Sequence, residues 1–137
     1  MSGFNRGDLA LILVVDDHAD TRRMMCRLLQ REGYAVETAE SGVDAIHVAQ
    51  ERKPDLILLD LMMPDMNGFQ VLKELRTLPS GESIPVIMLT GSSDRAHIQQ
   101  AKQLHVNGFY TKAQFRIVEL LDQIRSMAGK SDARHSN

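Results

Sequence analysis

The sequence predicts an α/β fold, a single doubly wound sheet of five parallel strands with five helices on its two faces. Short apolar runs alternate five times with segments of helical periodicity along the chain. The strongest runs are apolar throughout, which is typical of parallel strands covered by helices on both faces. Such alternation, joined by right-handed crossovers, favours a doubly wound sheet.

Five segments are predicted to be strands. Three of them, at residues 9–15, 55–60 and 85–90, are almost continuous apolar runs. The run "AVETA" at 35–39 is weaker because it contains two polar residues. The short run "GFYT" at 108–111 is assigned as a strand because the alternation requires one there.

The first three helices are predicted from apolar spacing and from residues that start or stop helices. The first covers about residues 19–32, and Gly33 is placed to end it. Ser41 is expected to cap the second helix, since its hydroxyl can accept from the first-turn N–H groups. Asn67 or Gly68 is expected to open the third.

The last two helices complete the alternation. Asp94 is expected to open the fourth helix, ahead of apolar residues at helical spacing. The fifth is predicted at about residues 114–127, with Val118, Leu121 and Ile124 facing the core. The sequence therefore predicts one folded domain at residues 9–128.

Composition limits the classes of function. Segments 1–8 and 129–137 are predicted to be an N-terminal extension and a polar, disordered tail. A net charge of −2 gives no basic footprint for nucleic acid and no attraction to anionic membranes. The single cysteine, Cys26, excludes an intrachain disulfide and fits a reducing compartment. Because no secretory signal or membrane-spanning run is evident, we expect a cytoplasmic protein.

Polar side chains stand where the predicted strands end. Asp16 and Asp17 follow the first strand, and Asp60 ends the third. Thr90 ends the fourth strand, and Lys112 follows the fifth. Ligands of open α/β sheets bind outside the carboxyl ends of the strands, so these five side chains can face one shallow crevice.

Three neighbouring carboxylates repel one another and need a counter-charge. Carboxylate oxygens suit a hard cation such as Mg²⁺, with Asp16 and Asp17 as holders and the Met62 backbone carbonyl completing the shell. Lys112 can pair with Asp60 or with a phosphoryl oxygen. The set suits phosphoryl transfer onto a carboxylate, and Asp60 is the best nucleophile because it ends the central strand alone.

Four motifs carry a resemblance to a known family. They are "ILVVDDH" (12–18), "PDLILLDLMMPDMNG" (54–68), "PVIMLTG" (85–91) and "GFYTK" (108–112). In this order and spacing they resemble the receiver domain of two-component response regulators, the CheY-like family, over about residues 9–127. The resemblance implies a flavodoxin-like sheet with strand order 2-1-3-4-5.

The resemblance also implies roles for the residues of the crevice. Asp60 matches the phosphoacceptor, and Asp16 and Asp17 match the acidic pair that binds Mg²⁺. Lys112 matches the lysine of the family motif. The phosphoryl group would come from a sensor histidine kinase or a histidine phosphotransfer protein, and the domain would catalyse only its own phosphorylation and dephosphorylation.

A switch is implied as well. Thr90 matches the family's switch hydroxyl, and Phe109 matches its switch aromatic. Phosphorylation would draw Thr90 inward, Phe109 would follow, and the surface of the fourth helix, fifth strand and fifth helix would change shape for a downstream effector, whose identity the sequence does not reveal.

One position departs from the family pattern, because Ala113 stands after Lys112 where the family usually has proline after a cis bond. A cis bond before a non-proline residue costs about 2.5–4 kcal/mol. We therefore predict a trans Lys112–Ala113 peptide and a locally altered loop.

Individual residues also allow simpler interpretations. Asp16 and Asp17 alone could be a turn and a helix cap. His18 could be a metal ligand, but we favour a first-turn surface residue because magnesium prefers oxygen. Of the two acids in "PDLILLDLMMPDMNG", Asp60 is expected to be the reactive one, and Asp65 is interpreted as a loop residue.

Three other functions compete with the phosphorylation switch. A phosphatase acting through an aspartyl phosphate needs a general acid two residues after the nucleophile, where this chain has Met62. A flavin carrier needs a phosphate-binding loop, and "DDHAD" would repel phosphate. A phosphorylation-independent interaction module is disfavoured by the intact acidic set. Because Met62 cannot orient a hydrolytic water, we expect slow self-dephosphorylation.

Overall fold

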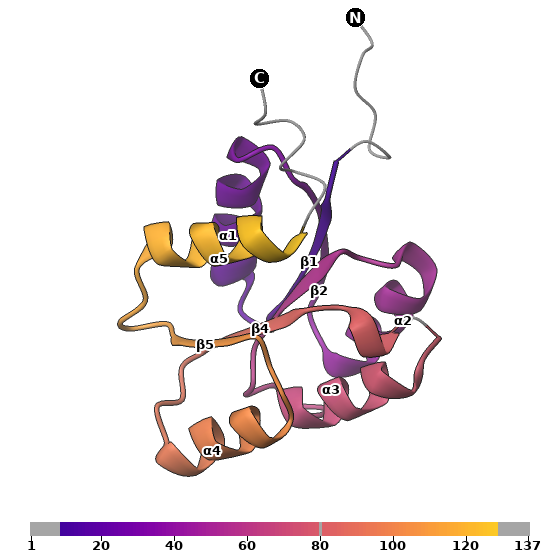
Figure 1. The fold of residues 1–137 in the computed structure, drawn as a ribbon, viewed down its shortest axis with the longest axis vertical. Helices are drawn as coiled ribbons and strands as arrows, with labels where there is room; N and C mark the ends of the chain where they lie inside the picture. Colours follow the sequence, from indigo (N-terminus) through magenta and orange to yellow (C-terminus); the bar gives the residue numbers. More distant parts are fainter. Residues whose placement is uncertain (1–8, 80, 129–137) are drawn as a thin grey trace, which may run out of the picture.

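The computed structural model describes residues 9–79 and 81–128, which form a parallel sheet between two layers of helices (Figure 1). The segments predicted as extension and tail, 1–8 and 129–137, lie outside the described residues. The strands are β1 (Leu11–Val15), β2 (Ala35–Ala39), β3 (Leu56–Leu59), β4 (Val86–Thr90) and β5 (Gly108–Thr111). The helices are α1 (Ala19–Arg31), α2 (Gly42–Arg52), α3 (Gly68–Thr77), the 3-10 turn η2 (Gly81–Ser83), α4 (Arg95–Gln103) and α5 (Ile117–Ala128).

The strand order is β2-β1-β3-β4-β5, and every neighbouring pair is parallel. The predicted fold class and the order implied by the family resemblance are both confirmed. β3 stops at Leu59, so Asp60 lies just past the strand rather than within it. The register of the β1–β3 pairing aligns Val15 with Leu59, which brings the carboxyl ends of these two strands to the same level.

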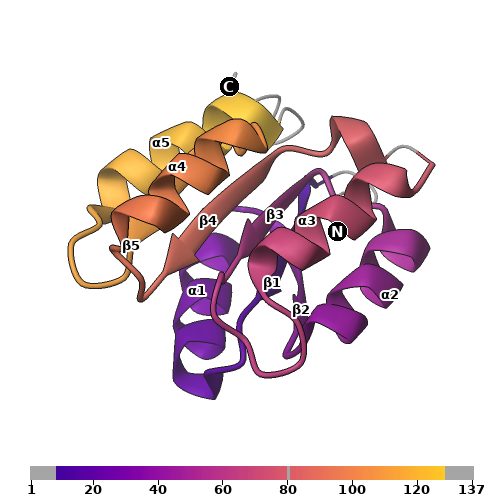
Figure 2. The ribbon, with the colours of Figure 1, turned by 90° about the horizontal axis from the view of Figure 1, so that it is seen from below.

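Alternate residues of the three central strands point into two separate cores. Leu13, Ile57 and Met88 pack with α2, α3 and α4 on one face. Ile12 and Leu58 pack with α1 and α5 on the other (Figures 1 and 2). Side chains alternate between faces along a strand, so strands buried on both faces must be apolar at every position.

The weaker strand predictions correspond to the edges of the sheet. β2 and β5 are the outermost strands. Glu37 of β2 is half-buried and Thr38 is exposed, which explains the polar residues in this strand. All four residues of β5 are partly exposed. Edge strands need less apolar surface because only part of each is covered by helices.

The predicted helix caps are confirmed. The Ser41 hydroxyl accepts a hydrogen bond from the Asp44 N–H at 3.1 Å. Asn67 forms a reciprocal capping box with Gln70 at the start of α3. The Asp94 carboxylate accepts from Ala96 N–H at 2.9 Å. Gly33, which follows α1, has a φ of 95°, which favours glycine.

The prediction for the fifth helix is wrong in its start and in one core residue. Residues 112–114 form a turn, and α5 begins only at Ile117. Val118 is 71% exposed, whereas Leu120 and Ile124 are fully buried. Because Val118 precedes Leu120 by two residues, it lies about 200° around the helix from it and faces away from the sheet. Leu121 is half-buried at the border of the core.

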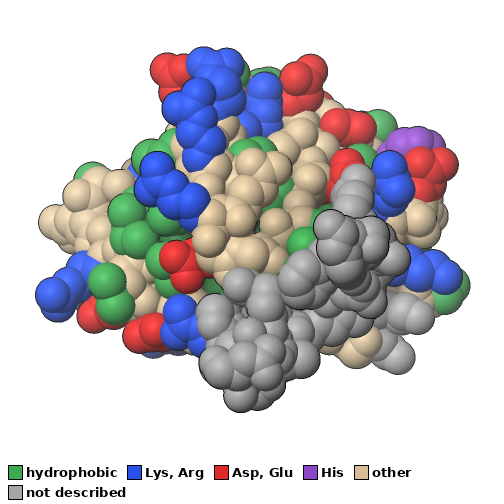
Figure 3. Space-filling model, turned by 90° about the horizontal axis from the view of Figure 1, so that it is seen from above, with side chains coloured by type: hydrophobic (Ala, Val, Ile, Leu, Met, Phe, Trp, Pro, Cys, Tyr) green, Lys and Arg blue, Asp and Glu red, His purple; other side chains and the backbone are tan. Residues whose placement is uncertain are grey.

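Two further expectations concern the backbone and the surface. The described residues contain no cis peptide, so the Lys112–Ala113 bond is trans as predicted. None of the helices within 9–79 and 81–128 has the length and hydropathy of a membrane span. On the face seen in Figure 3, acidic and basic side chains are interspersed with hydrophobic ones, in keeping with the net charge of −2.

The loop after β3 is fixed at both of its ends. The Asp65 carboxylate accepts from the N–H groups of Gly42 and Val43, at 3.0 and 3.1 Å, and so caps α2 from a distant part of the chain. Gly68 packs so closely on this loop that an added Cβ would meet the Asp60 carbonyl oxygen at 2.8 Å. The loop that begins at Asp60 is therefore tied to the starts of α2 and α3.

We expect Asp65→Ala to lower the free energy of unfolding by about 0.5–1 kcal/mol at neutral pH, because it removes a charged cap at an exposed site. Hydrogen bonds from Gly42 and Val43 hold the pKa of Asp65 below its usual value. The contribution is therefore present above the unfolded-state pKa and lost as the pH falls through the folded-state pKa. Urea denaturation at several pH values measures this, with Glu74→Ala as an exposed control. Equal losses in both variants would contradict the capping role.

Candidate functional site

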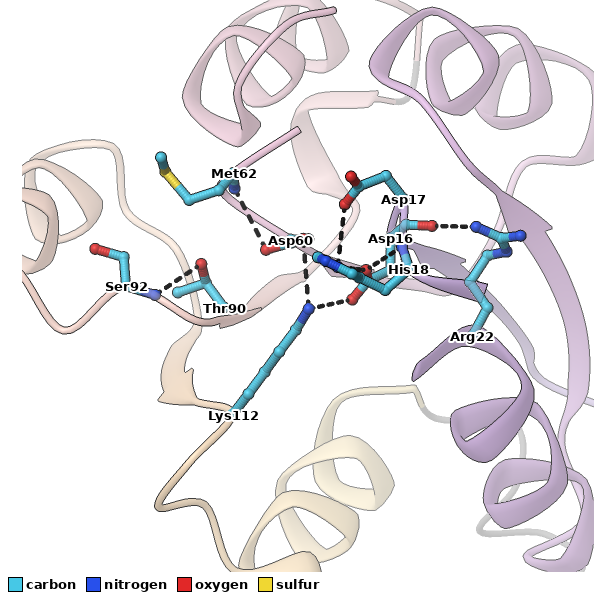
Figure 4. A network of polar contacts seen from close by, with 9 residues as sticks. All are labelled: Asp16, Asp17, His18, Arg22, Asp60, Met62, Thr90, Ser92 and Lys112. Atoms are coloured by element: carbon cyan, nitrogen blue, oxygen red, sulfur yellow. Dashed lines mark hydrogen bonds and ion pairs between the residues drawn. The ribbon is translucent and has the colours of Figure 1, made fainter. Parts of the chain in front are cut away.

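Three carboxylates meet at the carboxyl ends of β1 and β3, as the sequence predicts (Figure 4). The Asp60 N–H donates to the Val15 carbonyl at 2.9 Å, and the Asp16 N–H donates to the Ala39 carbonyl at 3.1 Å. These bonds extend the sheet pairing by one residue and fix both acids at its edge. The side chains of Asp16 and Asp60 are only 4% and 2% exposed, so both carboxylates are largely withdrawn from water.

Lys112 provides the positive charge of this edge. Its Nζ lies 2.8 Å from Asp16 Oδ2 and 3.5 Å from Asp60 Oδ2, so it bridges the two buried acids and pairs more closely with Asp16 (Figure 4). Its backbone N–H donates to the Thr90 carbonyl at 2.8 Å, which anchors it beside the end of β4. One lysine thus faces two buried carboxylates and a third close by.

The surroundings of Asp60 raise its pKa above the usual value for an aspartate. Burial raises the pKa of Asp60, and the negative charge of Asp16 raises it further. The Lys112 ammonium and the Met62 N–H, which donates to Asp60 Oδ1 at 3.3 Å, act in the opposite direction. Burial is the largest of these effects, so Lys112 and the Met62 N–H only partly offset the cost of holding a charged carboxylate at this edge.

Asp17 and His18 complete the acidic group. Asp17 Oδ1 is buried and makes no hydrogen bond, although His18 Nδ1 lies 3.3 Å away. One ligand atom from each of Asp16, Asp17, His18 and Asp60 falls within 4.8 Å of the others. An unsatisfied buried oxygen among three carboxylates fits a bound cation, since a cation would satisfy the oxygen and relieve the repulsion.

The two predicted switch residues lie on neighbouring strands. Thr90 is fully buried at the end of β4, and its Oγ1 accepts a hydrogen bond from the Ser92 N–H at 3.3 Å. Phe109 of β5 is partly buried and packs against the core beneath α4. The Met62 side chain is 53% exposed at the mouth of the site.

Two contacts near the site were missed by the sequence reasoning. Arg22 donates to the Asp16 carbonyl oxygen at 2.6 Å and so ties α1 to the end of β1. His97 of α4 has its Nδ1 2.6 Å from Ser92 Oγ, and its ring centroid lies 6.1 Å from that of Phe69. Arg22 could have been anticipated from its place on the first turns of α1, but His97 has no local signal that points to Ser92.

Comparison with known proteins identifies relatives. The family described as the response regulator receiver domain matches residues 12–125. The chain is 41% identical over 101 residues to the transcriptional regulatory protein ResD of Bacillus subtilis, covering 74% of this chain and 41% of ResD. It is 33% identical over 121 residues to the DNA-binding response regulator MtrA of Mycobacterium tuberculosis, covering 88% of this chain and 51% of MtrA. The chain thus spans about half the length of these relatives or less.

A solved structure supports the same assignment. The chemotaxis protein CheY4 of Vibrio cholerae superposes with a TM-score of 0.79 at 34% identity, covering 87% of this chain and 98% of that one. The similarity therefore covers most of this chain and nearly all of CheY4.

We expect Asp60→Asn to stabilise the folded protein at pH 7 in metal-free buffer, because it removes the cost of holding a charged carboxylate in a buried position. Because the folded-state pKa of Asp60 is raised, the folded protein loses stability as the pH rises from the unfolded-state pKa through the folded-state pKa. The difference between variant and wild type should therefore shrink as the pH is lowered toward about 4. Urea denaturation with a chelator present measures it.

Asp20→Asn is the matched control, since the Asp20 side chain is 95% exposed and should change stability little. A wild type more stable than Asp60→Asn at pH 7 would mean that attraction to Lys112 exceeds the cost of burial.

Proposed function

The chain belongs to the response regulator receiver domain family, and from this premise we propose that Asp60 is the residue that accepts the phosphoryl group. The single observation that carries the proposal is the position of Asp60. It is a carboxylate 2% exposed, at the end of the central strand, beside Lys112 and two further acids. Domains of this family take part in two-component signalling, in which a histidine kinase supplies the phosphoryl group.

The residues of the site divide the work of phosphoryl transfer. A carboxylate oxygen of Asp60 attacks phosphorus, and the phosphorus–nitrogen bond of the donor phosphohistidine breaks with its electron pair returning to the imidazole. Lys112, already within 3.5 Å of Asp60 Oδ2, balances the charge that collects on the phosphoryl oxygens. Asp60 needs no general base, because a carboxylate is already ionised when it attacks.

Asp16, Asp17, Asp60 and the Met62 backbone carbonyl are the groups that would hold Mg²⁺. When bound, this ion supplies neutralisation of the carboxylates and of the incoming phosphoryl oxygens. The unsatisfied Oδ1 of Asp17 supports this assignment. Apart from its own phosphorylation and the hydrolysis of its aspartyl phosphate by water, the domain acts as a signalling element and not as a metabolic enzyme.

The signal is read on the face formed by α4, β5 and α5. Thr90 moves toward the phosphoryl group, giving up the hydrogen bond from Ser92, and Phe109 shifts into the space that Thr90 leaves. The exposed apolar side chains of Ile117 and Val118, 44% and 71% accessible, give α5 a surface that a protein effector can cover. Val118, which was wrongly predicted to face the core, is exposed and therefore available to contact an effector.

The compartment and the partners follow from the same reasoning. A free, half-buried Cys26 fits the reducing conditions of the cytoplasm. The donor is a sensor histidine kinase or a histidine phosphotransfer protein, since both present a phosphohistidine. We expect the downstream effector to be a protein and not a nucleic acid, in keeping with the mixed charges of the chain.

The direct test is incubation with Mg²⁺ and acetyl phosphate, followed by intact-protein mass spectrometry. Wild type should gain one phosphoryl group, and Asp60→Asn or excess chelator should abolish the gain. Asp65→Asn is the matched control, because Asp65 lies in the same loop but caps α2, and it should be labelled like wild type. Labelling of Asp60→Asn to the wild-type level would overturn the assignment.

A second experiment concerns the lifetime of the phosphorylated state. Met62 is exposed beside Asp60, and its thioether is too weak an acceptor to orient water for in-line attack. We expect Met62→Asn to release phosphate several-fold faster than wild type, because the amide can hold that water. Decay of the phosphorylated proteins after donor removal measures the rates. Indistinguishable rates in wild type, Met62→Asn and a Met62→Leu control would contradict this role.

A further inference from the structure

The loop between β4 and α4 has little packing of its own. It covers residues 91–94, and Gly91, Ser93 and Asp94 are exposed. A Cβ added at Gly91 would meet no atom of residues 9–79 and 81–128 within 4 Å, its chain neighbours apart. Glycine is also the most permissive residue for backbone conformation. The path of this loop therefore depends on the hydrogen bonds that its residues make.

Ser92 is the residue that ties this loop to its surroundings. It is half-buried, and its N–H donates to Thr90 Oγ1 at 3.3 Å (Figure 4). Its Oγ accepts from the Asp94 N–H at 3.3 Å and lies 2.6 Å from Nδ1 of His97 on α4. Because Oγ already accepts from Asp94, its own proton is available to an unprotonated Nδ1. The serine hydroxyl is thus the donor to His97.

His97 has a fixed place from which to hold Ser92. It is half-buried in the first turn of α4, where its N–H donates to the Asp94 carbonyl at 3.1 Å. Its ring centroid lies 6.1 Å from that of Phe69, which is 3% exposed at the start of α3, with 56° between the ring planes. This tilted aromatic contact restricts the imidazole. The 2.6 Å contact therefore joins the loop to a helix and to a core ring.

We propose that His97 is a positioning residue for phosphoryl transfer, which acts through Ser92 to hold Thr90 in the position of the unphosphorylated domain. The inference rests on the proposed function, in which Thr90 gives up the hydrogen bond from Ser92 as it moves toward the phosphoryl group. While Ser92 is anchored on His97, its N–H stays directed at Thr90 Oγ1. Leaving that position then costs more free energy, so the Ser92–His97 bond slows phosphorylation.

The experiment measures the initial rate at which the full chain gains a phosphoryl group from acetyl phosphate and Mg²⁺, at a donor concentration below saturation. His97→Leu and Ser92→Ala each remove one partner of the bond. Each should raise the rate about two- to tenfold, which is the change that one net hydrogen bond represents. The double variant should be no faster than either single variant, because both substitutions break the same bond.

Two further variants serve as controls. His97→Asn should label at a rate close to that of wild type, because its side-chain oxygen can accept the proton of Ser92. His47→Leu should also label like wild type, because His47 is 65% exposed on α2 and pairs with Glu51 of the same helix.

A second readout separates positioning from a merely structural role. In unphosphorylated His97→Leu, the methyl resonance of Thr90 should move toward its position in phosphorylated wild type. A substitution that only loosened the fold would lower the free energy of unfolding without this shift and without faster labelling.

Unchanged or slower labelling in both single variants would refute the positioning role. A double variant whose gain is the product of the two single gains would refute it too, since the two residues would then act separately. If wild type is labelled at Asp60 and the variants behave like it, only this inference fails. If wild type gains no phosphoryl group, the proposed function fails as well.

Discussion

The rest of the structure depends on one constraint. The fold buries the carboxylate of Asp60 without fully compensating its charge. Asp60 ends β3, the middle strand, and the two cores on either side of the sheet hold that strand in place. Asp16 stands beside it at the same level, and the ammonium of Lys112 is shared by the two. Repulsion and desolvation at this edge are relieved by a cation or a change in protonation, and either event acts on a rigid platform.

The elements around this edge are coupled to it by direct bonds. Asp65, in the loop after Asp60, caps α2, and Gly68 packs against the Asp60 backbone at the start of α3. On the other side, Thr90 is joined to Ser92, and Ser92 to His97 of α4. These contacts join the end of β4 to α4, and they are the route that the proposed switch would use.

The sequence was informative wherever a signal is local. Ser41, Asn67 and Asp94 were predicted as caps because a cap involves residues two or three apart. The order of the strands came from the family resemblance, since alternation alone does not fix it. Val118 was misplaced because three apolar residues at helical spacing do not reveal which stripe meets the sheet. The capping of α2 by Asp65 joins residues far apart in the chain, so no local sequence pattern predicts it.

The most direct test of the cation site is the melting temperature of the protein at increasing Mg²⁺ concentrations. Binding to the folded state alone stabilises it by about 2.7 kcal/mol at a hundredfold excess over the dissociation constant. We expect a saturable rise in Tm for wild type and its loss in Asp17→Asn, because Asp17 Oδ1 is the buried oxygen that makes no hydrogen bond. A Tm that does not respond to Mg²⁺, or that rises equally in Asp17→Asn, would contradict a cation site at this edge of the sheet.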